Sequence, residues 1–127
     1  MAPESSATVC QSRIRLDVKI LFAGGSVELG GPSCQRGNTI GHDLLANNDN
    51  HNLWIWGNRV VNNLIVRNSH SATDSIVGNK VGNLRVAHSG PVFVNGNRAN
   101  NGTLRCIDDN PLTGSGNIAL GVNTCPK

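Results

Sequence analysis

The sequence is poor in aromatic residues and has no long apolar stretch. Its 127 residues include no tyrosine, two tryptophans and two phenylalanines, so the hydrophobic 38% consists mainly of valine, leucine, isoleucine and alanine. This composition excludes a core filled by large rings and favours inward positions occupied by small branched side chains. No run of about 18 apolar residues occurs, which predicts that no segment spans a membrane.

Charge is also scarce and only weakly biased. Eleven lysine and arginine residues against eight acidic residues give a net charge of +3. This bias permits an anionic partner without requiring one. It is too small, in a sequence without a base-reading motif, to predict that the protein binds nucleic acid.

The N-terminal part differs in composition from the rest. Its first residues lack the charged and apolar regions of a signal peptide, and we expect residues 1–8 to be disordered or to originate from an expression vector. All eighteen asparagines lie at or after Asn38. This change predicts one domain over residues 9–127, with irregular first coils at 9–36 and regular coils at 37–127. Apolar and charged residues alternate over residues 13–20, which predicts one half-buried strand, and residues 26–29 predict another.

The regular part repeats at intervals of about twenty residues. One apolar position recurs every twenty residues, and another recurs two positions after it. A Gly-Asn pair accompanies them at intervals of 20, 21, 18 and 20. Fixed self-similarity of this kind is typical of an array in which each repeat buries its apolar edge against its neighbours. The repeated positions are Leu44, Leu64, Leu84 and Leu104; Ala46, Val66, Val86 and Cys106; and Asn38, Asn58, Asn79, Asn97 and Asn117.

Each repeat contains three short segments of alternating apolar residues, separated by asparagine, glycine and serine. Segments of this length cannot form helices, and Asn and Gly supply turn conformations. We therefore predict an all-β fold, a parallel β-helix (β-solenoid) of about 5–6 coils, with strands about 4.8 Å apart. The recurrent asparagines are expected to stack as an amide ladder. A left-handed β-helix would need a hexapeptide period, and leucine-rich repeats would need helix formers between strands; neither is present.

Three stretches of the chain resemble a known class. Residues 37–41, residues 78–84 and the ending from Leu104 to Cys125 are similar to secreted, actinobacterial right-handed parallel β-helix repeat proteins, over roughly residues 26–127. The resemblance implies a right-handed solenoid. The class contains polysaccharide lyases, hydrolases and adhesins, so the resemblance implies architecture and no particular activity.

Four cysteines allow three disulfide connectivities. Cys106 and Cys125 are nineteen residues apart, about one coil, and stacked positions in neighbouring coils lie about 5 Å apart, within disulfide range. We favour this bridge, with Cys10 and Cys34 pairing across the first coil, and the other connectivities stay open. A zinc site would need C-x2-C spacing, so no metal or cofactor is expected. Disulfides predict a secreted or extracellular location.

Aromatic side chains form the first candidate binding surface. If Ile55 points inward, Trp54 and Trp56 point outward, and Phe93 lies on the same sheet. Planar rings on a flat exterior suit stacking against sugars or another protein. The competing interpretation is that residues 47–52 or the N-terminal segment cover these rings as a small satellite core.

Cationic side chains form the second candidate surface. Arg59, Lys80 and Arg98 occupy the same outward position in three consecutive coils, and Arg85 and Arg105 form a shorter row. Stacked like charges repel, and an anionic ligand such as a uronic acid, a sulfated glycan or a teichoic acid would offset that cost. The competing interpretation is a solvated face on which these charges serve solubility.

Catalysis is less favoured, and whether the chain is an enzyme stays uncertain. Histidines and acids are scattered near turns, and the adjacent pair Asp108–Asp109 is expected to diverge, with Asp108 capping a turn. Acid–base catalysis needs groups that converge. Thr39, Thr73 and Thr103 fall at different repeat positions, against an ice-binding array. The scattered groups are His42, His51, His70, His88, Asp43, Asp49 and Asp74.

The sequence therefore predicts a secreted, non-catalytic binding or structural module that recognises an anionic or neutral polysaccharide or a cell-surface protein. Trp54, Trp56 and Phe93 would stack on the ligand, and the three cations would supply charge. The alternative is a polysaccharide-acting enzyme, a lyase or hydrolase, or its remnant.

Overall fold

The computed structural model describes residues 6–21, 25–31, 33–48, 52–70 and 74–127. Within these residues every regular element is a strand, and there is no helix long and apolar enough to cross a membrane. The strands are β1 (Ala7–Val9), β2 (Arg13–Ile14), β3 (Val18–Leu21), β4 (Val27–Leu29), β5 (Thr39–Ile40), β6 (Leu44–Asn47), β7 (Leu53–Trp56), β8 (Arg59–Arg67), β9 (Asp74–Val77), β10 (Lys80–Ala87), β11 (Val92–Asn95), β12 (Arg98–Ala99), β13 (Leu104–Ile107), β14 (Leu112–Thr113) and β15 (Ile118–Ala119).

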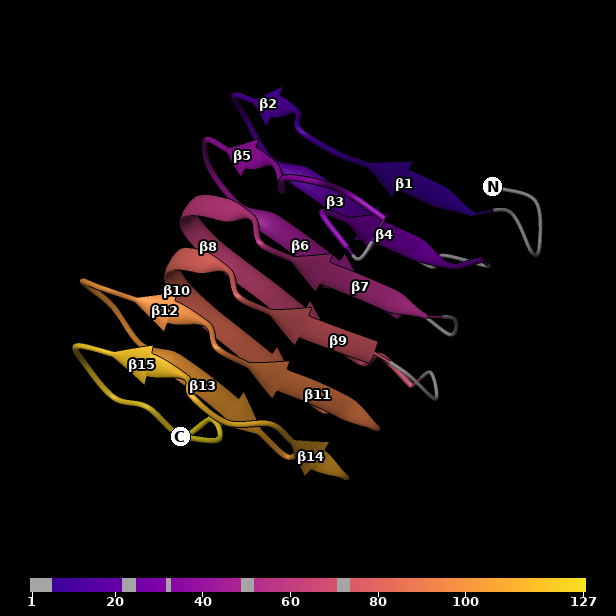
Figure 1. Ribbon diagram of the computed structural model, residues 1–127. Helices are drawn as coiled ribbons and strands as arrows, with labels where there is room; N and C mark the ends of the chain where they lie inside the picture. The colour runs from indigo at the N-terminus through magenta and orange to yellow at the C-terminus, as the bar shows by residue number, and fades with distance from the viewer. Residues whose placement is uncertain (1–5, 22–24, 32, 49–51, 71–73) are drawn as a thin grey trace.

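The strands pair in parallel with their equivalents one coil away, and they form two sheets (Figure 1). The first sheet has the order β1-β4-β7-β9-β11-β14. The second contains two rows, β2-β5-β8-β10-β12-β15 and β3-β6-β8-β10-β13, because the long strands β8 and β10 belong to both. The result is a β-solenoid of about five turns, which confirms the predicted all-β parallel β-helix.

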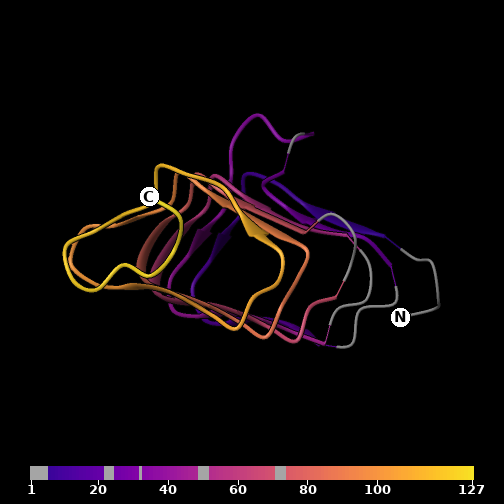
Figure 2. The same ribbon diagram turned by 90° about the horizontal axis from the view of Figure 1, so that it is seen from below.

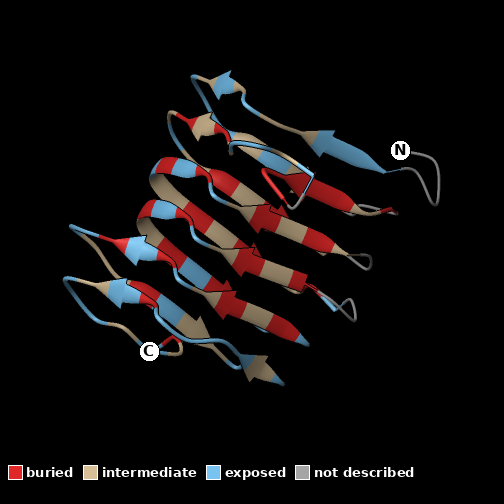
Figure 3. Ribbon diagram, viewed as in Figure 1, coloured by how far each residue is buried: buried red, intermediate tan, exposed pale blue. Residues whose placement is uncertain are grey.

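The twenty-residue apolar repeat is the core of the solenoid. Leu44, Leu64, Leu84 and Leu104 lie in register in consecutive coils and are at most 1% exposed. Along these strands buried residues alternate with half-buried or exposed ones, as the red and lighter bands of Figure 3 show. A one-residue shift of register would turn these leucines from the core to solvent. Because burying each leucine side chain contributes about 1.5–3 kcal/mol, the repeat fixes the register.

The repeated asparagines form the predicted amide ladder. In the first four of these asparagines the backbone N–H and the side-chain Nδ2 both donate to the Oδ1 of the next coil's asparagine, with Nδ2–Oδ1 distances of 2.9–3.1 Å. Nδ2 also donates to a backbone carbonyl of the preceding coil. All five side chains are buried, so this network satisfies polar groups that would otherwise destabilise the core. Its members are Asn38, Asn58, Asn79, Asn97 and Asn117.

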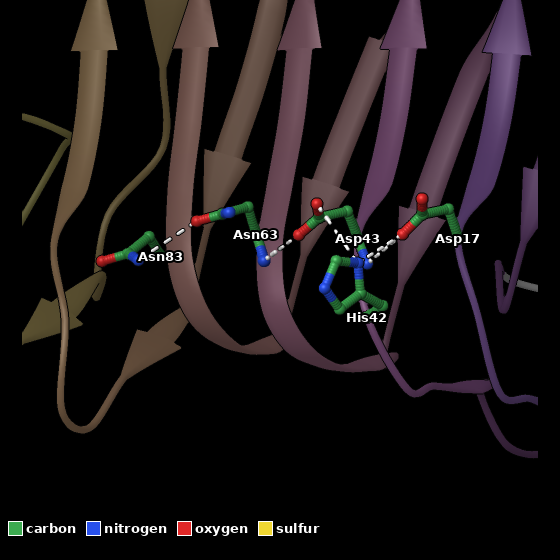
Figure 4. A network of polar contacts seen from close by, with 5 residues as sticks. All are labelled: Asp17, His42, Asp43, Asn63 and Asn83. Carbon is green, nitrogen blue, oxygen red and sulfur yellow. Dashed lines mark hydrogen bonds and ion pairs between the residues drawn. The ribbon is translucent and has the colours of Figure 1, made fainter.

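A second polar ladder, which was not predicted from the sequence, follows the corner between the two rows of the second sheet. In each coil a side-chain oxygen accepts a hydrogen bond from the next coil: Asp17 from the backbone N–H of Asp43 and Asp43 from that of Asn63, at 3.1 and 2.9 Å. Asn63 and Asn83 continue the pattern toward Thr103. We call this set the corner ladder. Figure 4 shows four of its members in line across neighbouring coils.

Both favoured disulfides are present, which excludes the other two connectivities. Cys106 and Cys125 have a Cα–Cα distance of 4.9 Å, and Cys10 and Cys34 have one of 5.5 Å. The segment that carries Cys34, between β4 and β5, stands on the outer face of the first sheet (Figure 2). It buries Glu28, whose carboxylate accepts hydrogen bonds from the backbone and hydroxyl of Ser33.

The N-terminal coil is more regular than expected. The alternation over residues 13–20 is not one strand: a corner at residues 15–17 separates β2 from β3 and leaves Leu16 76% exposed. This is the same corner that the later coils make, and Arg13 pairs with Thr39 and Val18 with Leu44. In addition, β1 begins at Ala7, two residues before the expected start of the domain.

Candidate anion-binding cleft

The three predicted cations lie in one row. Arg59 is in register with Lys80, and Lys80 with Arg98, and all three side chains are exposed. The row continues toward the N-terminus through Thr39 to Arg13. We call Arg59, Lys80 and Arg98 the cationic row. In-register pairing places successive charges about one strand spacing, 4.8 Å, apart along the solenoid axis.

A shallow cleft of about 400 Å³ follows this row. Apolar residues and side-chain amides line the cleft beside the cations. Val61, which is 56% exposed, belongs to the apolar part, and Asn100 and Asn101 in the turn after Arg98 supply the amides. Gly82 contributes to the cleft where coils approach closely, because a Cβ there would meet the carbonyl oxygen of Asn62 at 2.4 Å. The lining residues are Arg59, Val60, Val61, Lys80, Val81, Gly82, Arg98, Asn100 and Asn101.

The positive charge of the cleft is not neutralised internally. Within the described parts of the chain, no carboxylate lies in ion-pair distance of Arg59, Lys80 or Arg98, and the ion pairs that do form involve histidine. Asn100 and Asn101 are exposed and add amide donors. An arrangement of forked guanidinium donors, an ammonium group and amides is suited to binding several carboxylates or sulfates in sequence.

A second set of cations lies on the other row of the same sheet. Arg85 pairs with Arg105, as predicted, and both line a hollow of about 250 Å³ beside the corner ladder. Arg85 also lines a neighbouring hollow of about 440 Å³ with Arg67 and His88. In register, however, Arg85 has Ile65 rather than a cation on its other side, so the charges are less regular here than in the cationic row.

The predicted aromatic residues lie on the first sheet. Leu53 and Ile55 are buried, and Trp54 and Trp56 point to the outer face, where both are only half-buried. Trp54 and Phe93 are each in register with Ser75, which lies between them. The rings therefore share a face but are not stacked on adjacent strands.

The cover over Trp56 is the segment between β4 and β5. Trp56 lines a hollow of about 270 Å³ together with Gly30, Gly31 and residues 34–37. Its indole Nε1 is buried and has no hydrogen-bond partner among the described residues. The N-terminal segment was one of the two covers considered, and the observed cover is its last part, which the Cys10–Cys34 bridge ties to the first coil.

The aromatic and cationic candidates do not form one surface. The corner at Gly57–Asn58 separates them, because Gly57 has a φ of 68° and Asn58 turns into the core. Trp56 and Arg59 are three residues apart and so within about 11 Å, but the cleft of the cationic row contains none of Trp54, Trp56 and Phe93. The aromatic and cationic residues that were expected to bind one ligand together therefore lie on two faces.

The acidic pair diverges, as expected. Asp108 has a φ of 51°, like Asn48, Asn68 and His88 at the same turn, and its carboxylate lies 3.6 Å from Nδ1 of His88. Asp109 instead accepts a hydrogen bond from the backbone N–H of Ser89 at 2.9 Å, and burial raises its pKa to about 6. His51, Asp49 and Thr73 lie outside the described residues.

Comparison of the chain with protein-family models, with curated proteins and with solved structures found no match. The class of the protein, a small parallel β-solenoid closed by two disulfides, is therefore defined by its own fold.

Proposed function

We propose that the protein is a secreted, non-catalytic module that binds a linear anionic polysaccharide along the cationic row. The observation that carries this proposal is the register of Arg59, Lys80 and Arg98 in one cleft, without a carboxylate partner in the described part of the chain. A surface that serves only solubility would not need like charges in register on adjacent strands, because such charges repel one another.

The geometry favours a polymer over a small anion. Three charges spaced by one strand each form a line parallel to the solenoid axis, and a chain that carries an acidic group on successive sugars presents charges in a line as well. Each contact is a charge-assisted hydrogen bond. Because the cleft is shallow and open to solvent, affinity is expected to come from several weak contacts and to fall as salt screens them.

Secretion is supported by the two disulfides, since such bonds persist in oxidising compartments. The aromatic face, with Trp54 and Phe93 half-buried, offers a smaller surface for a neutral sugar or a protein partner. It lies beyond the Gly57–Asn58 corner and is not required for the anionic ligand.

A binding panel tests the function and separates it from the enzymatic alternative. Polygalacturonate and heparin, which carry carboxylates and sulfates respectively, are compared with neutral dextran by calorimetry, and the mixtures are examined for shortened chains. We expect an acidic polymer to bind without product release. Release of shortened chains would favour a lyase or hydrolase, and binding of dextran with no binding of either polyanion would overturn the proposal.

A further inference from the structure

Three groups that can ligate a metal converge at the corner between the first and second coils. Nδ1 of His42 lies 2.6 Å from Oδ1 of Asp17 and 3.5 Å from Oδ2 of Asp43 (Figure 4). One ligand atom from each of the three residues lies within 4.8 Å of the others. The hydrogen bond between His42 and Asp17 raises the pKa of the imidazole and lowers the pKa of the Asp17 carboxyl.

The corner ladder does not need these charges. Its structural role is to offer a side-chain oxygen to the next coil, and Asn63 and Asn83 do this with neutral amides. Asp17 and Asp43 do the same with carboxylates at adjacent rungs. Adjacent like charges repel, so the fold alone would favour asparagine at both positions. The two charged members of the corner ladder, Asp17 and Asp43, are the two whose carboxylates lie beside the imidazole of His42.

The distances suit a small divalent ion. Zinc binds imidazole nitrogen at about 2.0–2.1 Å and carboxylate oxygen at about 2.0–2.2 Å, so its ligand atoms lie roughly 3–3.5 Å from one another. The His42–Asp43 separation of 3.5 Å lies in this range. The His42–Asp17 separation of 2.6 Å is that of a hydrogen bond, and side-chain rotations that open this bond would bring it into the range. The backbone N–H groups that hold Asp17 and Asp43 fix one oxygen of each carboxylate in advance.

The site is open on its outer side. The side chain of His42 is 58% exposed and that of Asp17 is 41% exposed, so water can complete the coordination. A nitrogen ligand beside two carboxylates favours a transition-metal ion such as Zn²⁺ over Ca²⁺ or Mg²⁺, which prefer oxygen ligands alone.

We propose that Asp17, His42 and Asp43 bind one divalent transition-metal ion, with Zn²⁺ as the best-matched example. Such an ion joins the first coil to the second at a corner, as the Cys10–Cys34 bridge joins them at another position. No metal was expected from the sequence, because the cysteines lack zinc-site spacing. Asp17 is 25 residues from His42 and approaches it only when the coils stack. The site is independent of the cationic row and of the proposed function.

Calorimetric titration of the metal-free protein with ZnCl₂ tests the site, and Co²⁺ provides a visible absorption band as a second readout. No described cysteine is free, so thiols do not compete. The variants are Asp17→Asn and His42→Gln. Asp17→Asn keeps an oxygen for the corner ladder. His88→Gln is the matched control, because His88 is equally exposed and has one described carboxylate, that of Asp108 at 3.6 Å, within ion-pair distance.

We expect one Zn²⁺ per chain, at least a tenfold loss of affinity in both variants, and no change in His88→Gln. The Nδ1 resonance of His42 should shift on Zn²⁺ addition in nitrogen-detected spectra. Far-ultraviolet circular dichroism confirms that each variant is folded. Absence of stoichiometric binding, or unchanged affinity in folded His42→Gln, would overturn the proposal and leave His42 as the counter-ion of two stacked carboxylates.

Discussion

The backbone N–H of Asn117 donates a hydrogen bond to the carbonyl oxygen of Pro126 at 3.3 Å, and the Nδ2 of Asn117 donates to the same oxygen. In the four earlier coils these two donors meet the Oδ1 of the next asparagine. Pro126 therefore replaces the asparagine of a further coil, and Cys125 beside it is tied to Cys106. The C-terminal tail caps the amide ladder.

The first prediction concerns this cap. Replacing Cys106 and Cys125 together by serine should lower the free energy of unfolding by about 2–4 kcal/mol, because the bridge closes a loop of about one coil. Urea denaturation measures the loss, and peptide mapping of the oxidised protein should link Cys106 to Cys125. Amide exchange should accelerate first at Asn117 and then at Asn97. Faster exchange at the N-terminal coil alone would contradict the cap.

The second prediction concerns register. Leu84 is 1% exposed and Arg85, the next residue, is exposed. Leu84→Ala should therefore cost about 2–5 kcal/mol of unfolding free energy, whereas Arg85→Ala should change it by less than about 0.5 kcal/mol. Equal losses in urea denaturation of the two variants would show that the inward and outward assignments are wrong.

The third prediction concerns the amide ladder. Asn79→Ala removes the acceptor of the Asn58 backbone N–H and Nδ2, and it removes the donor to the carbonyl of Ile55. Buried groups without partners cost about 1–3 kcal/mol each, so the variant should lose at least about 3 kcal/mol or fail to fold. Asn100→Ala, at an exposed position, is the control and should behave like the parent protein in thermal unfolding.

The fourth prediction concerns pH. Burial raises the pKa of Asp109 to about 6, well above the ordinary value of an aspartate. The folded state therefore prefers the protonated form. The stability that this group contributes is fully present below about pH 4 and is lost as the pH rises through about 6. Asp109 is about half exposed, so screening limits the effect to on the order of 1 kcal/mol.

Asp109→Asn provides the comparison for that pH dependence. Urea denaturation at pH 4 and at pH 7 gives the free energy of unfolding at each pH. From pH 4 to pH 7 this free energy should fall by more in the parent protein than in the variant. The amide can still offer an oxygen to the backbone N–H of Ser89, so the variant should fold. The same pH dependence in both proteins would show that Asp109 is not responsible.

Repeats that use the same residue type in every coil could be predicted from the sequence. Leu44 and Asn58 belong to such repeats, and their burial and stacking were confirmed. The corner ladder was missed because its members change from Asp17 through Asn63 to Thr103, and the shared feature is only a side-chain oxygen at one position. In a ladder of mixed residue types, no single residue type recurs at the repeat interval, so the sequence pattern does not reveal it.

Alternation along the chain also misleads at corners. Leu16 continues the pattern of Ile14 and Val18, yet the corner between β2 and β3 turns it to solvent. The separation of Trp56 from Arg59 has the same origin, since the left-handed Gly57 redirects the chain between two sheets. Periodicity identifies which side of a strand a residue takes, but the angle between successive strands depends on the turn.

The role of the cationic row is tested most directly by matched charge removal. One triple variant replaces Arg59, Lys80 and Arg98 by alanine, and the control replaces Arg67, Arg85 and Arg105, which lowers the net charge equally on the other row. Calorimetry with the acidic polymer that binds, at two salt concentrations, measures both. We predict that the first variant loses at least tenfold in affinity and most of its salt dependence, while the control keeps both within about twofold. Equal weakening of the two variants would show a diffuse charge effect and would contradict the assignment of binding to the cationic row.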